Sequence, residues 1–286
     1  MQHTTKWMLK SFPLIIGSLL SFNILAEDAV VEENEDSSIA IESDECQSCK
    51  LSGSATLGYD TNIYSRSDHR SVRNISWRGS LNYSFNDAYR LYFNTGGYRA
   101  LEDEVGTYMT DTIVGLSRAK LYQFGETGAV GIAGQFTIPT SETSRKDSLN
   151  TAFRLAIPVS FKLWDANISI SPRVSKSFHE YKTSGGKSLT EWIYSISMGA
   201  NYRWDKLEMG ISALGGNSRS YQGTRRTELT YAGSIYAGYD LAENIGISLA
   251  VSTAGFYADA ERGTLGNIDL FDPDRATYIA EISYSF

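Results

Sequence analysis

Hydrophobic and polar residues alternate along most of the chain from Leu51 onward, with a period of two residues. In the segment 74–85, Ile75, Trp77 and Tyr83 are separated by asparagine, serine and arginine residues. A β-strand points successive side chains to opposite faces, so this period predicts strands with one apolar face and one polar face. We expect twelve strands, at 51–64, 74–85, 89–100, 108–121, 128–139, 150–163, 166–179, 191–204, 207–218, 227–241, 245–258 and 275–286.

The connections between these strands alternate in length. Tight turns, such as 86–88, 164–165, 205–206 and 242–244, alternate with longer polar segments. The longer segments are 65–73, 101–107, 140–149, 180–190, 219–226 and 259–274. Strands of this length suit a tilted crossing of a bilayer, and short turns opposite long loops are typical of a meander in a membrane. The pattern predicts an all-β fold, a closed antiparallel up-and-down transmembrane β-barrel of about twelve strands.

Aromatic residues gather at the two ends of the expected strands. At the tight-turn ends lie Tyr83, Phe85, Tyr89, Trp164, Trp204, Tyr239, Tyr284 and Phe286. Toward the loop ends lie Trp77, Trp192, Tyr194 and Tyr231. Two aromatic bands are expected where a barrel meets both membrane interfaces, whereas a soluble sandwich keeps its large aromatic residues in the core.

The first 50 residues differ in composition from the expected barrel at 51–286. Lys6 and Lys10 precede an apolar stretch at 12–20 and a small residue, Ala26, which together predict a secretory signal peptide over 1–26. Residues 27–50 hold nine acidic residues against one lysine, so this tail carries most of the net charge of −7. Such a block is expected to be a disordered periplasmic tail. The nearly neutral remainder gives no reason to expect nucleic-acid binding.

The tail contains the most distinctive local motif, Cys46-Gln47-Ser48-Cys49. In an oxidising periplasm the default expectation is a local disulfide. Redox exchange, docking of a periplasmic partner and metal binding are the alternatives, although two cysteines alone supply too few ligands for a structural zinc site.

The segment 276–286 alternates apolar and polar residues and ends in Phe286. Together with the strand pattern, it resembles the outer-membrane β-barrel class of Gram-negative bacteria. Ile282, Tyr284 and Phe286 look like the C-terminal signal that the barrel-assembly machinery reads, although Glu281 stands where many members place glycine. The resemblance implies a bacterial outer-membrane location, with lipid and the assembly machinery as partners and both termini periplasmic. We expect no cofactor.

If the apolar faces contact lipid, the opposite faces line a lumen that is rich in small residues. Its basic residues are expected on the second to eighth strands: Arg78, Arg90, Arg154, Lys162, Arg173 and Arg203. Its acidic residues are expected on the first, ninth, tenth and twelfth strands: Asp60, Glu208, Asp240 and Glu281. One wall should therefore be basic and the other acidic, with Asp111 as a candidate exception, and such a transverse field would orient polar solutes.

Few residues suggest catalysis or metal binding. His69 and Ser71 have the spacing seen in some outer-membrane lipid hydrolases, but they fall in a polar loop away from the expected lipid-facing wall. His179 has no nucleophile near it in sequence. The spacing of Asp269, Asp272 and Asp274, in the segment 259–274, does not fit a known calcium loop. We therefore expect neither a catalytic nor a metal site.

The leading hypothesis is a porin-like channel for passive diffusion of small polar or anionic solutes. The first alternative is a structural or assembly barrel whose tail, 27–50, docks a periplasmic partner, with interior ion pairs that plug the lumen. The second alternative is a lipid hydrolase. A channel should conduct ions without its tail, whereas a docking barrel should lose its partner when the tail is deleted.

The cysteine motif gives the first testable prediction. In protein isolated from the periplasmic side of the cell, Cys46 and Cys49 should resist a maleimide probe until a reductant is added. Quantitative thiol labelling followed by mass spectrometry measures this. Full labelling without reductant would contradict the disulfide.

Overall fold

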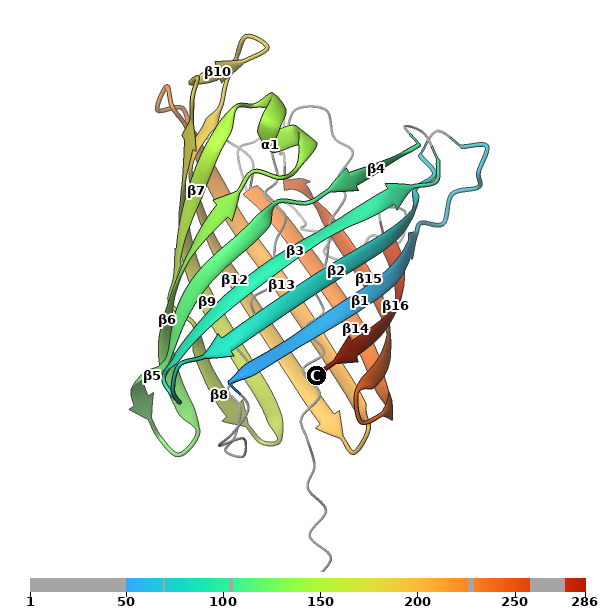
Figure 1. Ribbon diagram of the computed structural model, residues 1–286, viewed down its shortest axis with the longest axis vertical. Coiled ribbons are helices and arrows are strands. Elements are labelled where there is room, and N and C mark those ends of the chain that lie inside the picture. Colours follow the sequence, from blue (N-terminus) through green and yellow to red (C-terminus); the bar gives the residue numbers. More distant parts are fainter. Residues whose placement is uncertain (1–49, 69, 103–104, 226–228, 258–275) are drawn as a thin grey trace, which may run out of the picture.

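The structure is a computed structural model that describes residues 50–68, 70–102, 105–225, 229–257 and 276–286. It is a closed antiparallel β-barrel of twelve strands, as predicted (Figure 1). The elements are β1 (Leu51–Thr61), β2 (Arg73–Ser84), β3 (Tyr89–Ala100), β4 (Gly106–Met109), β5 (Thr112–Phe124), β6 (Gly128–Ile138), α1 (Glu142–Lys146), β7 (Leu149–Ala156), β8 (Val159–Leu163), β9 (Ala166–His179), β10 (Thr183–Ser184), β11 (Lys187–Ser188), β12 (Thr190–Trp204), β13 (Leu207–Ser220), β14 (Leu229–Ala242), β15 (Ile245–Tyr257) and β16 (Thr277–Ser285).

Two of the twelve barrel strands are interrupted. The fourth consists of β4 and β5, with a register shift inside β5 between Arg118 and Tyr122 and a positive φ of 51° at Lys120. A bulge moves the following residues to the other face, which explains why this strand alternates poorly in sequence. The sixth consists of β7 and β8, which are separated at Pro158, a residue with no N–H to give to the ladder.

The two ends of the described barrel meet, because β1 pairs with β16 along its length. Gly53 and Phe286 exchange both backbone hydrogen bonds, each at 3.0 Å. The pairing of β9 with β12 completes the ring on the other side. Each barrel strand therefore has a partner on both sides, which is what a sheet needs in a medium that supplies no hydrogen bonds.

The outer wall is apolar and the inner wall is polar, the reverse of a soluble protein. Outward residues such as Leu57, Ile235 and Leu249 are 58%, 49% and 66% exposed. Inward serines, including Ser234 and Ser252, are almost fully buried. The expected aromatic band at the tight turns is present, with its tryptophans and phenylalanines exposed on the outside. This distribution confirms the assignment of faces that the period of two predicts.

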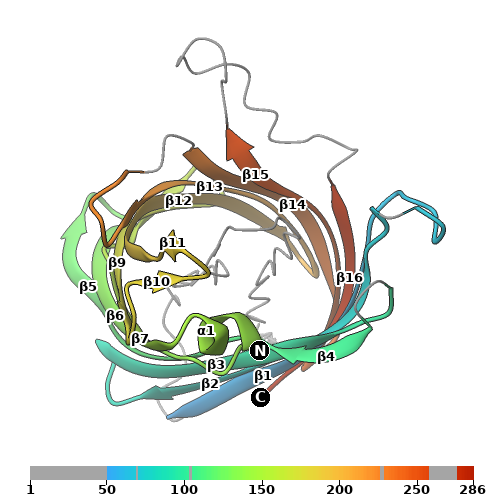
Figure 2. The ribbon, with the colours of Figure 1, turned by 90° about the horizontal axis from the view of Figure 1, so that it is seen from above.

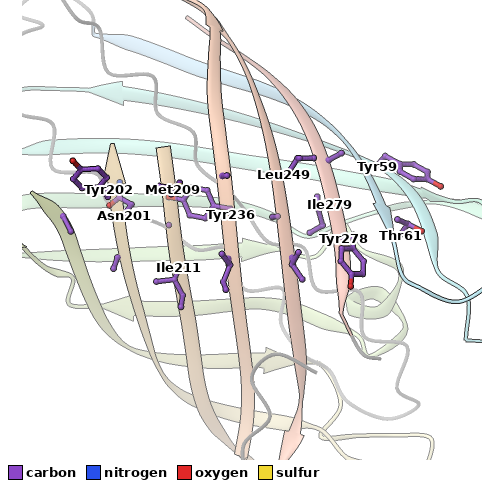
Figure 3. Close-up of a pocket in the computed structure, with 18 residues that line it drawn as sticks. Tyr59, Thr61, Asn201, Tyr202, Met209, Ile211, Tyr236, Leu249, Tyr278 and Ile279 are labelled. Carbon is purple, nitrogen blue, oxygen red and sulfur yellow. The ribbon is translucent and has the colours of Figure 1, made fainter. Parts of the chain in front are cut away.

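The outer wall also has an apolar hollow that runs from β12 across to β1 (Figure 3). Its lining includes the alanines Ala200, Ala237 and Ala280 together with larger residues such as Met209 and Leu249. Small side chains between large ones are enough to produce such a surface. Within the described residues, no helix is long and apolar enough to cross a membrane.

The longer loops are more ordered than their sequence suggests. The connection after β6 forms the one-turn helix α1, and the connection after β9 forms the hairpin β10–β11. Both elements stand at the loop end of the barrel (Figure 1), and from above they lie within the ring of strands (Figure 2). They therefore narrow the entrance from that side.

Two inward tyrosines lie flat along the wall on glycines of neighbouring strands. Tyr92 on β3 covers Gly115 on β5, and its hydroxyl donates to Gln135 Oε1 on β6 at 3.1 Å. Tyr236 on β14 covers Gly210 on β13 and donates to Glu208 Oε1 at 2.9 Å. A glycine is required beneath each ring, because a Cβ at Gly115 would stand 2.1 Å from Tyr92 Cζ.

This contact predicts a specific loss of stability. Gly115→Ala should lower the free energy of unfolding by about 1–3 kcal/mol, because Tyr92 must leave its place and its bond to Gln135. Urea unfolding in detergent micelles or lipid vesicles measures the change. Gly79→Ala is the matched control, since a Cβ there meets nothing within 4 Å. Equal stability of the two variants would contradict the packing role.

Candidate functional site: the lumen lining

The charged residues predicted to face the lumen follow the order of strands around the ring. The basic residues lie on β2, β3, β7, β8, β9 and β12, and the acidic residues lie on β13, β14, β16 and β1. We call these two sets of strands the basic arc and the acidic arc. Because β12 is adjacent to β13 and β1 is adjacent to β2, the two arcs meet at two places, which we call seams. What happens at these seams determines the field inside the barrel.

At the first seam, Arg78 on β2 forms an ion pair with Glu281 on β16, reaching across β1. Both side chains are nearly buried, at 11% and 8% exposure. Ser248 on β15 donates to the second carboxylate oxygen of Glu281 at 3.4 Å. Asp60 lies toward the loop end of the same seam and accepts from Ser76 at 3.3 Å.

At the second seam, Arg203 on β12 contacts two carboxylates. Its Nη2 donates to Asp240 Oδ2 on β14 at 2.9 Å, and its Nε lies 3.6 Å from Glu208 Oε2 on β13. Glu208 also accepts the Tyr236 hydroxyl. Charges of opposite sign are thus paired where the two arcs meet.

Away from the seams, the basic arc pairs guanidinium groups with serine hydroxyls. Arg154 on β7 donates from Nε to Ser175 Oγ at 3.0 Å. Arg173 on β9 is 6% exposed and donates from Nη2 to Ser197 Oγ at 2.7 Å. These two hydroxyl partners are neutral. Basic side chains of this kind favour anions in a pore.

The last two basic residues lie nearer the tight-turn end. Arg90 follows the first residue of β3, and Lys162 is exposed near the end of β8. Both occupy the inward parity of their strands, yet they stand at the rim rather than at mid-depth. Of the ten predicted charged residues, Arg78, Arg173 and Glu281 have side chains that are buried or nearly buried.

The interior ion pairs run along the wall. Arg78 and Glu281 belong to strands that are next but one in the ring, as do Arg203 and Asp240, while Arg203 and Glu208 belong to adjacent strands. Closing the lumen would need side chains that meet from opposite walls. These three pairs therefore do not form the plug that the alternative hypothesis requires, and the two inward tyrosines also lie along the wall.

A charged cluster at the loop end of the barrel holds the first long loop at the entrance. Glu102 accepts from Arg73 and Ser71, and Arg66 Nε lies 3.4 Å from it. Arg73 also donates to the carbonyl oxygen of Tyr64 at 3.1 Å. The hydrogen bond from Ser71, followed by Arg73 and Arg66, holds the pKa of Glu102 below its usual value.

A second polar contact fixes α1 at the entrance. Asp111, between β4 and β5, accepts from the backbone N–H of Ser141 at 2.7 Å and from the hydroxyl of Ser144. Its two carboxylate oxygens thus hold the start of the helix. Asp111, the candidate exception on the basic wall, anchors a loop rather than lining the middle of the lumen.

Residues considered for other chemistry have local partners or lie outside the described residues. The Ser71 hydroxyl donates to Glu102, and His179 Nδ1 lies 3.3 Å from the Tyr221 hydroxyl, which donates to the Ser177 carbonyl. Residues 1–49, which include the signal peptide, the acidic tail, Cys46 and Cys49, lie outside the described part, as do His69 and the aspartates of 259–274. The described residues contain no cluster of three metal-binding side chains.

Sequence reasoning missed the contacts that join distant segments. The tyrosine–glycine pairs and the Glu102 and Asp111 contacts were not predicted. Strand parity does place Tyr92 and Tyr236 on the inner face, so their position could have been found. The partners of Glu102 and Asp111 lie in irregular loops, where no period gives a signal.

No family model matches the chain, and no curated protein matches it in sequence. Solved structures show the fold. A NanC porin superposes with a TM-score of 0.55 at 10% identity, covering 81% of this chain and 98% of that chain. An outer membrane channel from Pseudomonas putida F1 superposes with a TM-score of 0.54 at 13% identity, covering 82% and 95%. The chain therefore has the β-barrel fold of outer-membrane channels.

The Glu102 cluster predicts a pH-dependent entrance. Folding lowers the pKa of the Glu102 carboxyl, so the ionised carboxylate stabilises the loop fully at a pH above the pKa of Glu102 in the unfolded chain. This stabilisation is lost as the pH falls through the lowered pKa of the folded protein. A spin label at Ser67 should therefore become more mobile in acid. In Glu102→Gln the label should be mobile at every pH. A spin label at Glu126, in a turn at the other end of the barrel, is the control. If the mobility of the Ser67 label did not change with pH in the protein that retains Glu102, the prediction would be wrong.

Proposed function

We propose that the protein is an outer-membrane channel for passive diffusion of small polar solutes, with a preference for anions. The observation that carries the proposal is the closed barrel whose inner wall is polar and whose interior ion pairs lie along the wall. Twelve strands stand between barrels that are filled by side chains and the wide porins.

The preference for anions rests on the unequal arcs. Three of the four predicted acidic residues, Glu208, Asp240 and Glu281, form ion pairs with Arg203 or Arg78. On the opposite arc, Arg154 and Arg173 each donate to a serine hydroxyl, and the six predicted basic residues outnumber the four predicted acidic ones. A solute that passes through the lumen therefore meets an electric field directed from the basic arc toward the acidic arc. This field attracts the negative end of the solute to β7 and β9.

We also propose that the barrel is inserted through the barrel-assembly machinery, with Ile282, Tyr284 and Phe286 as the signal. The three side chains share the outward face of the closing segment and are 49%, 50% and 58% exposed. A machinery that binds the last strand from outside the sheet could contact them together.

The channel hypothesis predicts measurable currents. In a planar bilayer under a KCl gradient, the purified protein should open channels that pass chloride in preference to potassium. The double variant Arg154→Gln, Arg173→Gln should lower the permeability ratio about fivefold, which corresponds to about 1 kcal/mol of electrostatic interaction with the ion. The reversal potential measures the ratio.

Lys162→Gln is the matched control, because it removes a predicted lining cation at the exposed rim and should change the ratio less. Resistance of the folded band to SDS at room temperature confirms that each variant forms a barrel. The absence of channels in the unmodified protein would contradict the function. An unchanged ratio in the double variant would contradict the role of the two arginines.

A further inference from the structure

Four adjacent strands place aromatic and basic residues in one row on the outer wall. The register pairs Phe153 on β7 with Lys176 on β9, Lys176 with Trp192 on β12, and Trp192 with Arg219 on β13. Residues paired directly across strands point to the same face. The row lies at the loop end of the barrel, since β9 and β12 are joined by the β10–β11 hairpin (Figure 1).

The lysine in this row is held among aromatic rings. Lys176 Nζ lies 4.7 Å from the centroid of Trp192 and 5.6 Å from that of Phe178. Tyr194 stacks on Trp192, with ring centroids 6.3 Å apart and planes inclined by 12°. Aromatic rings of this kind mark the level of lipid headgroups, so the ammonium group is held at that level.

Two arginines follow Trp192 in the row and are paired with each other through their backbones. Arg219 and Arg225 form an isolated antiparallel bridge, and both side chains are exposed. Their Nε atoms donate to neutral acceptors, Gly223 O at 3.2 Å and Asn217 Oδ1 at 3.3 Å. Like charges opposite each other are destabilising unless an anion lies between them.

A carboxylate lies beside the lysine of this group. Glu191 Oε1 lies 3.4 Å from Lys176 Nζ, and both side chains are partly exposed. Within the described part of the chain, Lys176 has one carboxylate partner and the two arginines donate to neutral acceptors, so Lys176, Arg219 and Arg225 together carry an excess of positive charge.

We propose that this cationic–aromatic row, defined as Lys176, Trp192, Arg219 and Arg225, binds the phosphorylated headgroup of a membrane lipid of the lipid A type. Phosphate is the anion that arginine and lysine bind most readily. The stacked Trp192 and Tyr194 continue from the cations into the apolar wall, where acyl chains would lie. The inference rests on the membrane location proposed above, and it does not depend on conduction.

The test uses the full protein in detergent, with lipid A as the probe. Native mass spectrometry or a fluorescence titration gives the affinity for lipid A and for the same lipid after removal of its phosphates. The unmodified protein should prefer the phosphorylated form. Lys176→Gln and Arg219→Gln should each weaken binding of lipid A about fivefold, as expected for one cation near a charged headgroup.

Arg118→Gln is the matched control. Arg118 also lies over an aromatic ring, 5.4 Å from the centroid of Tyr89, but at the tight-turn end of the barrel. This variant should bind lipid A as the unmodified protein does. Channel recordings on the same samples separate the two proposals, because lipid binding can be lost while conduction remains.

Two results would overturn the inference. One is equal affinity of the unmodified protein for phosphorylated and dephosphorylated lipid A. The other is an unchanged affinity for lipid A in the triple variant Lys176→Gln, Arg219→Gln, Arg225→Gln, with its barrel shown to be folded by resistance to SDS.

Discussion

The requirement that every backbone N–H and C=O in a hydrocarbon medium find a partner within the protein determines the rest of this structure. An open sheet would leave two unpaired edges, so the sheet closes, with β1 on β16 and β9 on β12. Closure then places one face of every strand on the outside of the barrel and the other face on the inside. One face must be compatible with lipid, and the other becomes the wall of an enclosed space whose chemistry the chain is free to choose.

The same separation explains why charge is arranged by strand. Because side chains cannot cross from one face to the other, an inward charge can be neutralised only by neighbours along the wall or by the contents of the lumen. The chain uses the first solution at both seams, through Arg78 and Arg203. On the arc between the seams, Arg154 and Arg173 each donate to a serine hydroxyl. On the outer wall the surroundings are apolar, so an outward cation such as Lys176 needs an aromatic partner or a polar headgroup.

The period of two was enough to predict the barrel and its two faces, since both depend on alternation alone. It could not predict pairing across the ring, because the choice of Glu281 for Arg78 depends on the stagger between β16, β1 and β2. The period of two also could not predict where strands are interrupted. Pro158 and the bulge near Lys120 interrupt strands that the pattern treats as continuous, and α1 forms where Asp111 receives two hydrogen bonds from a distant loop.

The bonds between Gly53 and Phe286 have a kinetic consequence. They join residues from opposite ends of the barrel sequence, so the ring cannot be completed by local events, and the entropy of closing so long a loop must be overcome late in folding. Until then both edge strands are exposed to pairing with other chains. A mutation that slows the docking of β16 should therefore increase aggregation during biogenesis, even where the finished barrel is as stable as before.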